Sequence, residues 1–266
     1  MPSKTKIEVL QKETAELRNH LAELIFEVDQ NIFHKSKYLE KEYMEKIGHL
    51  ELKSFQIQCA ILRIRRKIEI VKELIDNNRY LDLEFVEKIL DIDFEENNAM
   101  LQEQSNLLKL ALTQTEKFTL SAAEENMLCS NYQELIANLH PDLNLQQSEE
   151  ASALYQEGVN AFSKKDLTEL EKVLEKSLSF KRPAPIITDS DLLLQNKEAL
   201  EKAINDLQEQ QNFLFKSFPF INLELLHDDD QLNAKIHELN EHINYYETHF
   251  ARFENQLKEL VASRSN

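Results

Sequence analysis

The feature that most constrains the fold is an unbroken ladder of mostly apolar residues between Tyr43 and Ile75, which recur at alternating spacings of four and three. On an α-helix this spacing places every member on one narrow stripe, because positions three and four apart lie above one another. A stripe of this length must be covered by another helix, so the chain is expected to contain long packed helices. The ladder consists of Tyr43, Ile47, Leu50, Ser54, Ile57, Ile61, Ile64, Ile68, Val71 and Ile75.

Three other segments carry stripes of the same kind. A break near residues 31–36 is expected to separate the first of them from the central ladder. The chain has only 2 Gly and 5 Pro, and 30% of its residues are charged, which favours long helices with short connections. The stripe members are Ile7, Leu10, Thr14, Leu17, Leu21, Leu24 and Val28; Leu193, Leu200, Leu207 and Leu214; and Leu232, Ile236, Leu239, Ile243, Tyr246, Phe250, Phe253, Leu257 and Leu260.

These patterns predict an all-α fold in which long heptad-patterned helices form an intramolecular antiparallel coiled coil or bundle, with a short helical hairpin between them. The expected domains are residues 1–118, which hold the N-terminal coiled-coil helices, and residues 119–182, which hold the short hairpin. Residues 183–266 are expected to form a C-terminal coiled-coil hairpin with antiparallel helices. Two prolines close together, Pro183 and Pro185, predict a semi-rigid linker before this last hairpin.

The short hairpin is predicted from helix-start and helix-stop signals. Ser121 and Glu124 have the spacing of a capping box, so a helix is expected to begin there. Pro141 is expected to end this helix and to push His140 into an extended conformation, so that His140 and Asp142 face water. A second helix is expected from about residue 148 onward, antiparallel to the first. The apolar faces that would pair are Tyr132, Leu135, Ile136 and Leu139 on the first helix and Leu154, Tyr155, Ala161 and Phe162 on the second.

This segment resembles the second half of a J-domain, the module with which co-chaperones stimulate the ATPase of DnaK-type heat-shock chaperones. The family's His-Pro-Asp tripeptide falls on His140, Pro141 and Asp142, followed by Asn144, and Tyr132 matches the tyrosine of its second helix. The resemblance implies that these five residues bind the chaperone, with Asp142 pairing with an arginine of the partner. It covers residues 121–180.

The match departs from the family in three ways, the first being that the family's Tyr-Tyr-x-x-Leu-Gly type of first helix is missing and a long helix ending near Lys117 stands in its place. The family's second helix presents arginine and lysine toward the chaperone, and here Gln133, Glu134, Ala137 and Asn138 stand at those positions. Such a change removes or reverses the charge complementarity that steers and orients an encounter. Gly158 stands where the family's third helix has an aliphatic residue. The remainder of the chain, in residues 43–48, 59–69 and 218–220, resembles bacterial helical proteins with an embedded J-like segment.

Charge and hydropathy limit the class of partner. The net charge of −17 repels phosphate backbones and anionic lipid heads, so neither nucleic-acid nor membrane binding is expected. No apolar run approaches the roughly 18 residues of a membrane span, and the N-terminus lacks the pattern of a signal peptide. The isolated Cys59 and Cys129 are expected to be reduced and buried. We therefore expect a cytoplasmic protein.

Few residues suggest chemistry outside the short hairpin. His237 and His242 are five residues apart, about 140° around a helix, so a solvated face is expected rather than a metal site. We expect no enzymatic activity, cofactor or metal. Two clusters are open to a structural or a partner-binding interpretation, and we favour a basic stripe paired with the chain's own acidic helices for the first and a buried turn for the second. These clusters are Arg63, Arg65, Arg66 and Lys67; and Phe213, Phe215, Phe218 and Phe220.

Two functional hypotheses follow. In the first, the chain is a J-domain-like co-chaperone or adaptor that contacts a DnaK-type chaperone through His140, Pro141 and Asp142 and binds a protein partner, or another copy of itself, through its coiled coil. In the second, it is a non-enzymatic coiled-coil scaffold or assembly protein in which the hairpin has lost its chaperone. The intact loop favours the first hypothesis, and the uncharged second helix favours the second.

Overall fold

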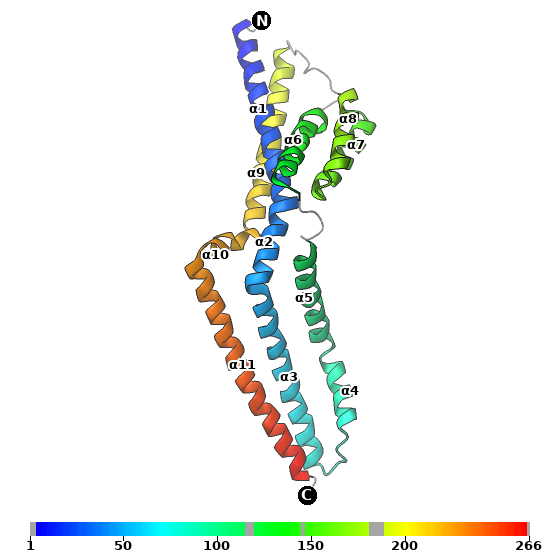
Figure 1. Ribbon diagram of the computed structural model, residues 1–266, viewed down its shortest axis with the longest axis vertical. Helices are drawn as coiled ribbons and strands as arrows, with labels where there is room; N and C mark the ends of the chain where they lie inside the picture. Colours follow the sequence, from blue (N-terminus) through cyan, green and yellow to red (C-terminus); the bar gives the residue numbers. More distant parts are fainter. Residues whose placement is uncertain (1–3, 115–119, 145–146, 181–188, 265–266) are drawn as a thin grey trace. The chain divides into compact units, whose positions relative to one another are not determined.

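The computed structural model describes residues 4–114, 120–144, 147–180 and 189–264, and all regular secondary structure in these residues is helical, without a β-strand. The predicted all-α fold class is therefore confirmed. The chain divides into two compact units, each built from two separate stretches of sequence (Figure 1). Unit 1 comprises residues 1–39 and 115–221, and unit 2 comprises residues 40–114 and 222–266.

Unit 1 contains a long helix pair and a group of three shorter helices. Its core joins residues from both long helices and from all three shorter ones, including Leu21, Leu135 and Leu200. The elements are α1 (Lys4–Gln30), η1 (Asn31–Lys35), the start of α2 (Ser36–Tyr43), α6 (Ala122–Leu139), α7 (Glu149–Ser163), α8 (Leu167–Ser177), η3 (Leu178–Phe180), α9 (Ser190–Phe215) and the start of η4 (Phe220–Asn222).

The long pair in unit 1 consists of α1 and α9, which lie side by side and run in the same direction (Figure 1). Lys197, near the start of α9, forms an ion pair of 2.8 Å with Glu13 in the first half of α1. Farther along both helices, Ile204 joins Leu24 in the core. The predicted stripe on α1 is buried except at the half-buried Ile7 and Leu17, and its polar member Thr14 donates a hydrogen bond of 2.7 Å to the carbonyl oxygen of Leu10.

Unit 2 is built around α3, which carries most of the ladder that runs from Tyr43 to Ile75. Helix α11 runs parallel to α3, with an ion pair of 2.9 Å between Lys53 and Glu247. Helices α4 and α5 run back along α3 in the opposite direction (Figure 1). The elements are the end of α2, η2 (Met44–Gly48), α3 (His49–Asp76), α4 (Leu83–Asp93), α5 (Glu95–Gln114), the end of η4, α10 (Leu223–His227) and α11 (Asp229–Arg264).

The expectation that the two C-terminal stripes pair with each other as an antiparallel hairpin is wrong. Helix α9 packs along α1 in unit 1, and α11 packs along α3 in unit 2. A heptad stripe specifies that a helix needs a partner but does not say which one or in which direction. The two units also divide the chain differently from the three consecutive domains expected from the sequence. The expected linker at residues 181–185 lies outside the described residues.

Residues 31–36, where a break was expected, are helical instead. Residues Asn31–Lys35 form a π-helical turn, which accommodates one extra residue without ending the helix. Ser36 donates a hydrogen bond of 2.5 Å to the carbonyl oxygen of Ile32 and so helps to satisfy the widened turn. Among the described residues, no helix has the length and apolar character needed to cross a membrane.

Candidate functional site

The candidate site is the loop between α6 and α7, and α6 begins where the sequence predicts. The Ser121 hydroxyl accepts a hydrogen bond of 3.3 Å from the Glu124 amide, and the Glu124 carboxylate accepts one of 2.7 Å from the Ser121 amide. These reciprocal bonds form a capping box. At the other end, His140 is extended, with φ −65° and ψ 130°, because Pro141 excludes the helical conformation at the preceding residue. The capping box and the proline stop are both confirmed.

The loop is held together by hydrogen bonds to His140. Its carbonyl oxygen accepts bonds of 3.1 Å from the Leu143 amide and 3.1 Å from the Asn144 side chain. The Asp142 amide donates a bond of 3.2 Å to Nδ1 of His140. Because Nδ1 accepts this bond, the neutral ring carries its proton on Nε2. Asn144, which the resemblance assigned to partner binding, thus has an internal structural contact within the loop.

His140 is more buried than the sequence predicted. Only 14% of its side chain is exposed, and its ring meets that of Tyr155 edge to face, with centroids 5.1 Å apart. This burial lowers the pKa of His140, and the nearby Asp142 carboxylate opposes the shift only in part. The expectation that His140 faces water is therefore wrong. The edge-to-face contact with the buried Tyr155 ring favours a buried His140 ring over the exposed ring expected from the polar loop.

Pro141 and Asp142 form the accessible tip of the loop. Both are exposed, and 53% of the Asp142 side chain is open to solvent. The Asp142 carboxylate lies 3.9 Å from Nδ1 of His140, which is too far for a direct hydrogen bond. The expectation that Asp142 faces water is confirmed, and its carboxylate is available to a cationic group of another molecule.

Tyr132 lies in the core rather than at the surface. It has no exposed area, and its ring stacks on Phe162 with centroids 3.9 Å apart and planes 5° apart. Its hydroxyl donates a hydrogen bond of 2.6 Å to the Asp29 carboxylate of α1. Burial raises the pKa of Tyr132, as do the negative charge and hydrogen bond of Asp29. Internal packing thus encloses the Tyr132 side chain completely, and its role in partner binding stays a prediction.

Gly158 allows α7 to approach α6 closely. A Cβ atom at this position would lie 2.0 Å from Cδ2 of Leu135 and 3.3 Å from Cγ1 of Val173 on α8. Leu135 and Val173 are themselves fully buried, so neither has free space to move into. The absence of an aliphatic residue at position 158, a departure from the J-domain pattern, is therefore explained by close helix packing.

The C-terminal end of α7 is fixed by groups from the N-terminal segment. The carbonyl oxygen of Phe162 accepts a hydrogen bond of 2.8 Å from Nε2 of His34, and that of Ser163 accepts one of 3.4 Å from the Lys37 ammonium. These carbonyls are among the last four of a helix and have no partner within it. Burial lowers the pKa of His34, which favours its neutral form. The π-helical turn and the start of α2 thus each supply one donor to the end of α7.

Sequence reasoning missed Asp29 and His34, which contact the hairpin from α1 and η1. Asp29 lies 103 positions from Tyr132 in the sequence, and His34 lies 128 positions from Phe162. An acidic or basic residue beside a heptad stripe usually faces solvent, so nothing local distinguishes these two. The hairpin did carry one signal: Tyr132 lies on an otherwise apolar stripe, and a buried tyrosine hydroxyl requires a hydrogen-bond partner.

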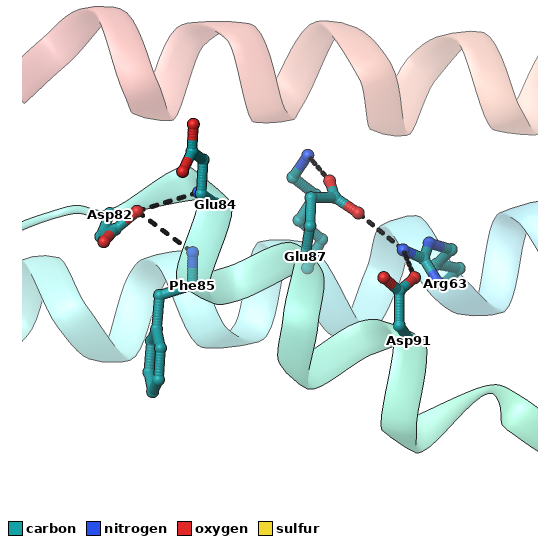
Figure 2. Close-up of polar contacts among 7 residues, drawn as sticks. Arg63, Asp82, Glu84, Phe85, Glu87 and Asp91 are labelled. Atoms are coloured by element: carbon teal, nitrogen blue, oxygen red, sulfur yellow. Dashed lines mark hydrogen bonds and ion pairs between the residues drawn. The ribbon is translucent and has the colours of Figure 1, made fainter.

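The basic cluster of α3 is paired with α4 inside unit 2. Figure 2 shows Arg63 between Glu87 and Asp91, at 2.6 Å and 2.7 Å, and Glu87 also pairs with Lys67. Arg66 pairs with Asp93 at 3.1 Å. The favoured interpretation, a basic stripe paired with the chain's own acidic helices, is confirmed for Arg63, Arg66 and Lys67. Figure 2 also shows Asp82 capping α4 through the amides of Glu84 and Phe85.

The two remaining candidates give different outcomes. His237 and His242 are exposed on α11, as predicted, and the described residues contain no group of three or more side chains suited to a metal ion. The phenylalanine cluster is mostly exposed, with 74% of Phe213, 42% of Phe215 and 45% of Phe218 open to solvent, whereas Phe220 is buried. The expectation of a buried turn is therefore wrong for three of its four members.

Comparison with known proteins gives no independent guide to the function. The chain matches no family model, no curated protein and no solved structure. The functional conclusion must therefore rest on the residues and on the geometry of the loop.

Proposed function

We propose that this chain is a non-enzymatic helical adaptor that presents the loop of His140, Pro141 and Asp142 to a DnaK-type heat-shock chaperone. The long helix pairs would bind the adaptor's other protein partner. A chaperone partner of this kind would place the protein in the cytoplasm. The effect on the chaperone would be a conformational trigger, since a bound adaptor shifts the equilibrium between chaperone states according to its affinity for each.

The observation that carries the proposal is the exposed Asp142 carboxylate at the tip of an internally bonded, proline-braced loop. A loop fixed by hydrogen bonds to the His140 carbonyl loses little conformational freedom on binding, which lowers the cost of association. A carboxylate with 53% of its side chain exposed can pair with an arginine of the chaperone. A carboxylate and an arginine can form two parallel hydrogen bonds, and this bidentate pair would give the contact both direction and specificity.

The experiment is single-turnover ATP hydrolysis by a DnaK-type chaperone from the same organism, with the full chain added over a concentration series. The informative variant is Asp142→Asn, which removes the charge from an exposed side chain and keeps its size. The matched control is Glu157→Gln, which removes one charge from the exposed side of α7. His140→Gln is a weaker test here, because it also removes a ring that packs against Tyr155.

We expect the wild-type chain and Glu157→Gln to accelerate hydrolysis equally, and Asp142→Asn to lose most of the acceleration. A charge-assisted hydrogen bond of the kind proposed contributes about 1.5 to 3 kcal/mol, which corresponds to a loss of affinity of roughly tenfold or more. No acceleration by the wild-type chain at tens of micromolar would refute the chaperone proposal. Equal loss in the two variants would show that overall charge, rather than the loop, is responsible.

A second candidate function is a helical scaffold or assembly protein that has no chaperone partner. Two observations favour it: Tyr132 is buried against α1, and the outward positions of α6 hold Gln133, Glu134 and Ala137, none of which is basic. Without a positive face, electrostatic steering toward an acidic chaperone surface is lost. Absence of ATPase stimulation together with a stable self-association measured by sedimentation would favour this candidate.

A further inference from the structure

We propose that the outward face of α5 binds a basic amphipathic helix of a protein partner. The biological meaning of this inference rests on the proposed function, which it deepens by giving the adaptor's second protein partner a binding surface and a chemical class. Helix α5 belongs to unit 2, whereas the candidate loop belongs to unit 1. The two surfaces can therefore be tested separately.

The outward face of α5 carries three large apolar side chains that are about half open to solvent. The exposed fractions are 53% for Met100, 48% for Leu107 and 51% for Leu110. Their spacing of seven and three residues places them on one stripe of the helix. Helix α5 contacts α3 through its other side, where the Asn97 side chain donates a hydrogen bond of 3.8 Å to the Cys59 sulfur. The packing of α5 on α3 thus leaves this apolar stripe open.

The same face is hollowed, and one charged group lies in the hollow. The Gln102 side chain donates a hydrogen bond of 2.9 Å to the side-chain oxygen of Asn106, so these two amides bond to each other. Glu103 is exposed and forms no ion pair with any residue that the structure describes. The shallow hollow has a volume of about 560 Å³ and is lined by Ala99, Gln102, Glu103, Asn106, Leu107 and Leu110.

The charges of α5 select the kind of partner. The helix has three exposed carboxylates, Glu95, Glu96 and Glu103, and one ammonium, Lys109. Glu103 lies within the apolar stripe, four residues before Leu107, so a helix that covers the stripe must also cover this carboxylate. Covering a carboxylate is unfavourable unless a cation pairs with it. A partner helix with lysine or arginine beside its apolar residues satisfies both requirements.

A second copy of the chain fits this face less well. A two-fold antiparallel pairing that places Met100 over Leu110 of the other copy is centred near residue 105. The two Glu103 carboxylates would then lie only about 6 Å apart along the helix axis. Lys109 would lie opposite Leu101 rather than opposite a carboxylate. Repulsion between the two covered carboxylates would therefore oppose self-association through this face.

The test is fluorescence anisotropy of two labelled synthetic peptides titrated with the full-length chain. Each peptide is an amphipathic helix of about 18 residues, with leucine at positions i, i+3, i+4 and i+7 of its apolar face. The first peptide has lysine on its polar face, and the second has glutamate at the same positions. We expect the lysine peptide to bind and the glutamate peptide not to bind.

Leu110→Gln should weaken binding of the lysine peptide by roughly five- to tenfold, because covering a leucine side chain contributes about that much affinity. Glutamine has nearly the same helix propensity as leucine, so α5 should remain folded. The matched control is Leu62→Gln, which replaces a leucine of α3 in the same unit that is 49% exposed. The control should leave the affinity within about twofold of the wild type.

Glu103→Gln should weaken binding of the lysine peptide by about two- to fivefold, because it removes the carboxylate that pairs with lysine. Its control is Glu259→Gln, which removes an exposed carboxylate from α11 and changes the net charge equally. Equal weakening by both variants would show that the peptide responds to the overall charge of the chain, which would overturn the proposal.

Three other results would also overturn it: no binding of the lysine peptide, equal binding of the glutamate peptide, or equal weakening by Leu110→Gln and Leu62→Gln. Self-association in sedimentation that Leu110→Gln abolishes would show instead that the face joins two copies. ATP hydrolysis by the chaperone is a separate readout, and Leu110→Gln should leave its stimulation unchanged. If stimulation is absent while the peptide binds as expected, the chaperone function fails and the binding surface on α5 stands.

Discussion

Both units contain helices with apolar stripes, but the two units bury these stripes in different ways. In unit 1 several helices converge, and most of the largest fully buried side chains of the described residues lie there, including Tyr132 and Phe162. In unit 2, α3 packs against α11 and against α4 and α5, and two of the buried clusters centre on Ile47 and on Leu90. Ion pairs between Arg63, Lys67 and Glu87 supplement them.

The unit 1 cluster is a convergent core whose buried residues come from five helices, whereas the unit 2 clusters around Ile47 and Leu90 each join two elements along a seam. In a convergent core a lost side chain leaves a cavity that many neighbours line, so the cost is high. Along a seam with half-exposed ion pairs, single charges contribute little, because water and salt screen them. Unit 1 is therefore expected to be the more sensitive unit to substitution.

Phe162→Ala should have the largest effect, a destabilisation of unit 1 by about 3 to 5 kcal/mol. Phe162 has no exposed area and contacts Tyr132, Phe26, Phe33 and His34 through its ring. Hydrogen exchange followed by mass spectrometry should show faster exchange in α6, α7 and α8, with α3 and α4 unchanged.

The reciprocal variant is Leu90→Ala in the small cluster between α3 and α4. It should accelerate exchange in α3 and α4 and leave α6 and α7 as in the wild type. If either variant accelerates exchange equally in both units, the units unfold as one body and the comparison between two separate cores fails.

The two glycines offer the next contrast, because Gly158→Ala should destabilise unit 1 whereas Gly48→Ala should stabilise unit 2. At Gly158 the added Cβ would meet the fully buried Leu135, at a cost of about 1 to 3 kcal/mol for overpacking. At Gly48 it would lie 2.5 Å from the flexible Met44 thioether, which can move aside. Alanine would then contribute its helix propensity, up to about 1 kcal/mol.

Denaturant unfolding of both variants, with hydrogen exchange to locate the change, measures these opposite signs. The double variant Leu135→Ala with Gly158→Ala serves as the control, since removing the Leu135 side chain should relieve the clash. Additive costs in the double variant would indicate that Leu135 is not the obstacle.

The helical stripes could be predicted from the sequence because their spacing is a local property. The capping box at Ser121 and the stop at Pro141 were equally accessible, since each depends on residues within one turn. The direction and partners of α9 and α11 were not, because heptad stripes are nearly interchangeable. The burial of His140 and Tyr132 was also missed, because it depends on Tyr155, Phe162 and Asp29 meeting in space.

Glu87→Gln should have a smaller effect than the core variants, a loss of about 0.2 to 1 kcal/mol in unit 2, because 43% of the Glu87 side chain is exposed. Hydrogen bonds from Lys67 and Arg63 lower the pKa of Glu87. A carboxylate with a lowered pKa stabilises the fold above its ordinary pKa of about 4.3, and this contribution is lost as the pH falls through the lowered value. Denaturant unfolding of the wild type and Glu87→Gln at two salt concentrations should show a difference that shrinks at high salt. A difference independent of salt would mean that packing, rather than charge, is lost.

His140→Gln should have the smallest effect, a change in how the stability of unit 1 depends on pH. Burial lowers the pKa of His140, so the unfolded chain binds a proton more readily than the folded chain in the range between the lowered value and the ordinary value of about 6.5. Stability from this residue is fully present above the ordinary pKa and is lost as the pH falls below it. Denaturant unfolding between pH 5 and 7 should therefore show a free energy of unfolding that rises less steeply with pH for His140→Gln than for the wild type. His34, whose pKa is also lowered, retains its own contribution in both chains.

The matched variant His237→Gln removes an exposed histidine from α11 and should leave the slope for unit 1 unchanged. Equal slopes for the wild type and His140→Gln would show that the loop opens readily enough for His140 to be protonated in the folded chain. The loop of unit 1 would then be as mobile as the exposed surface of unit 2.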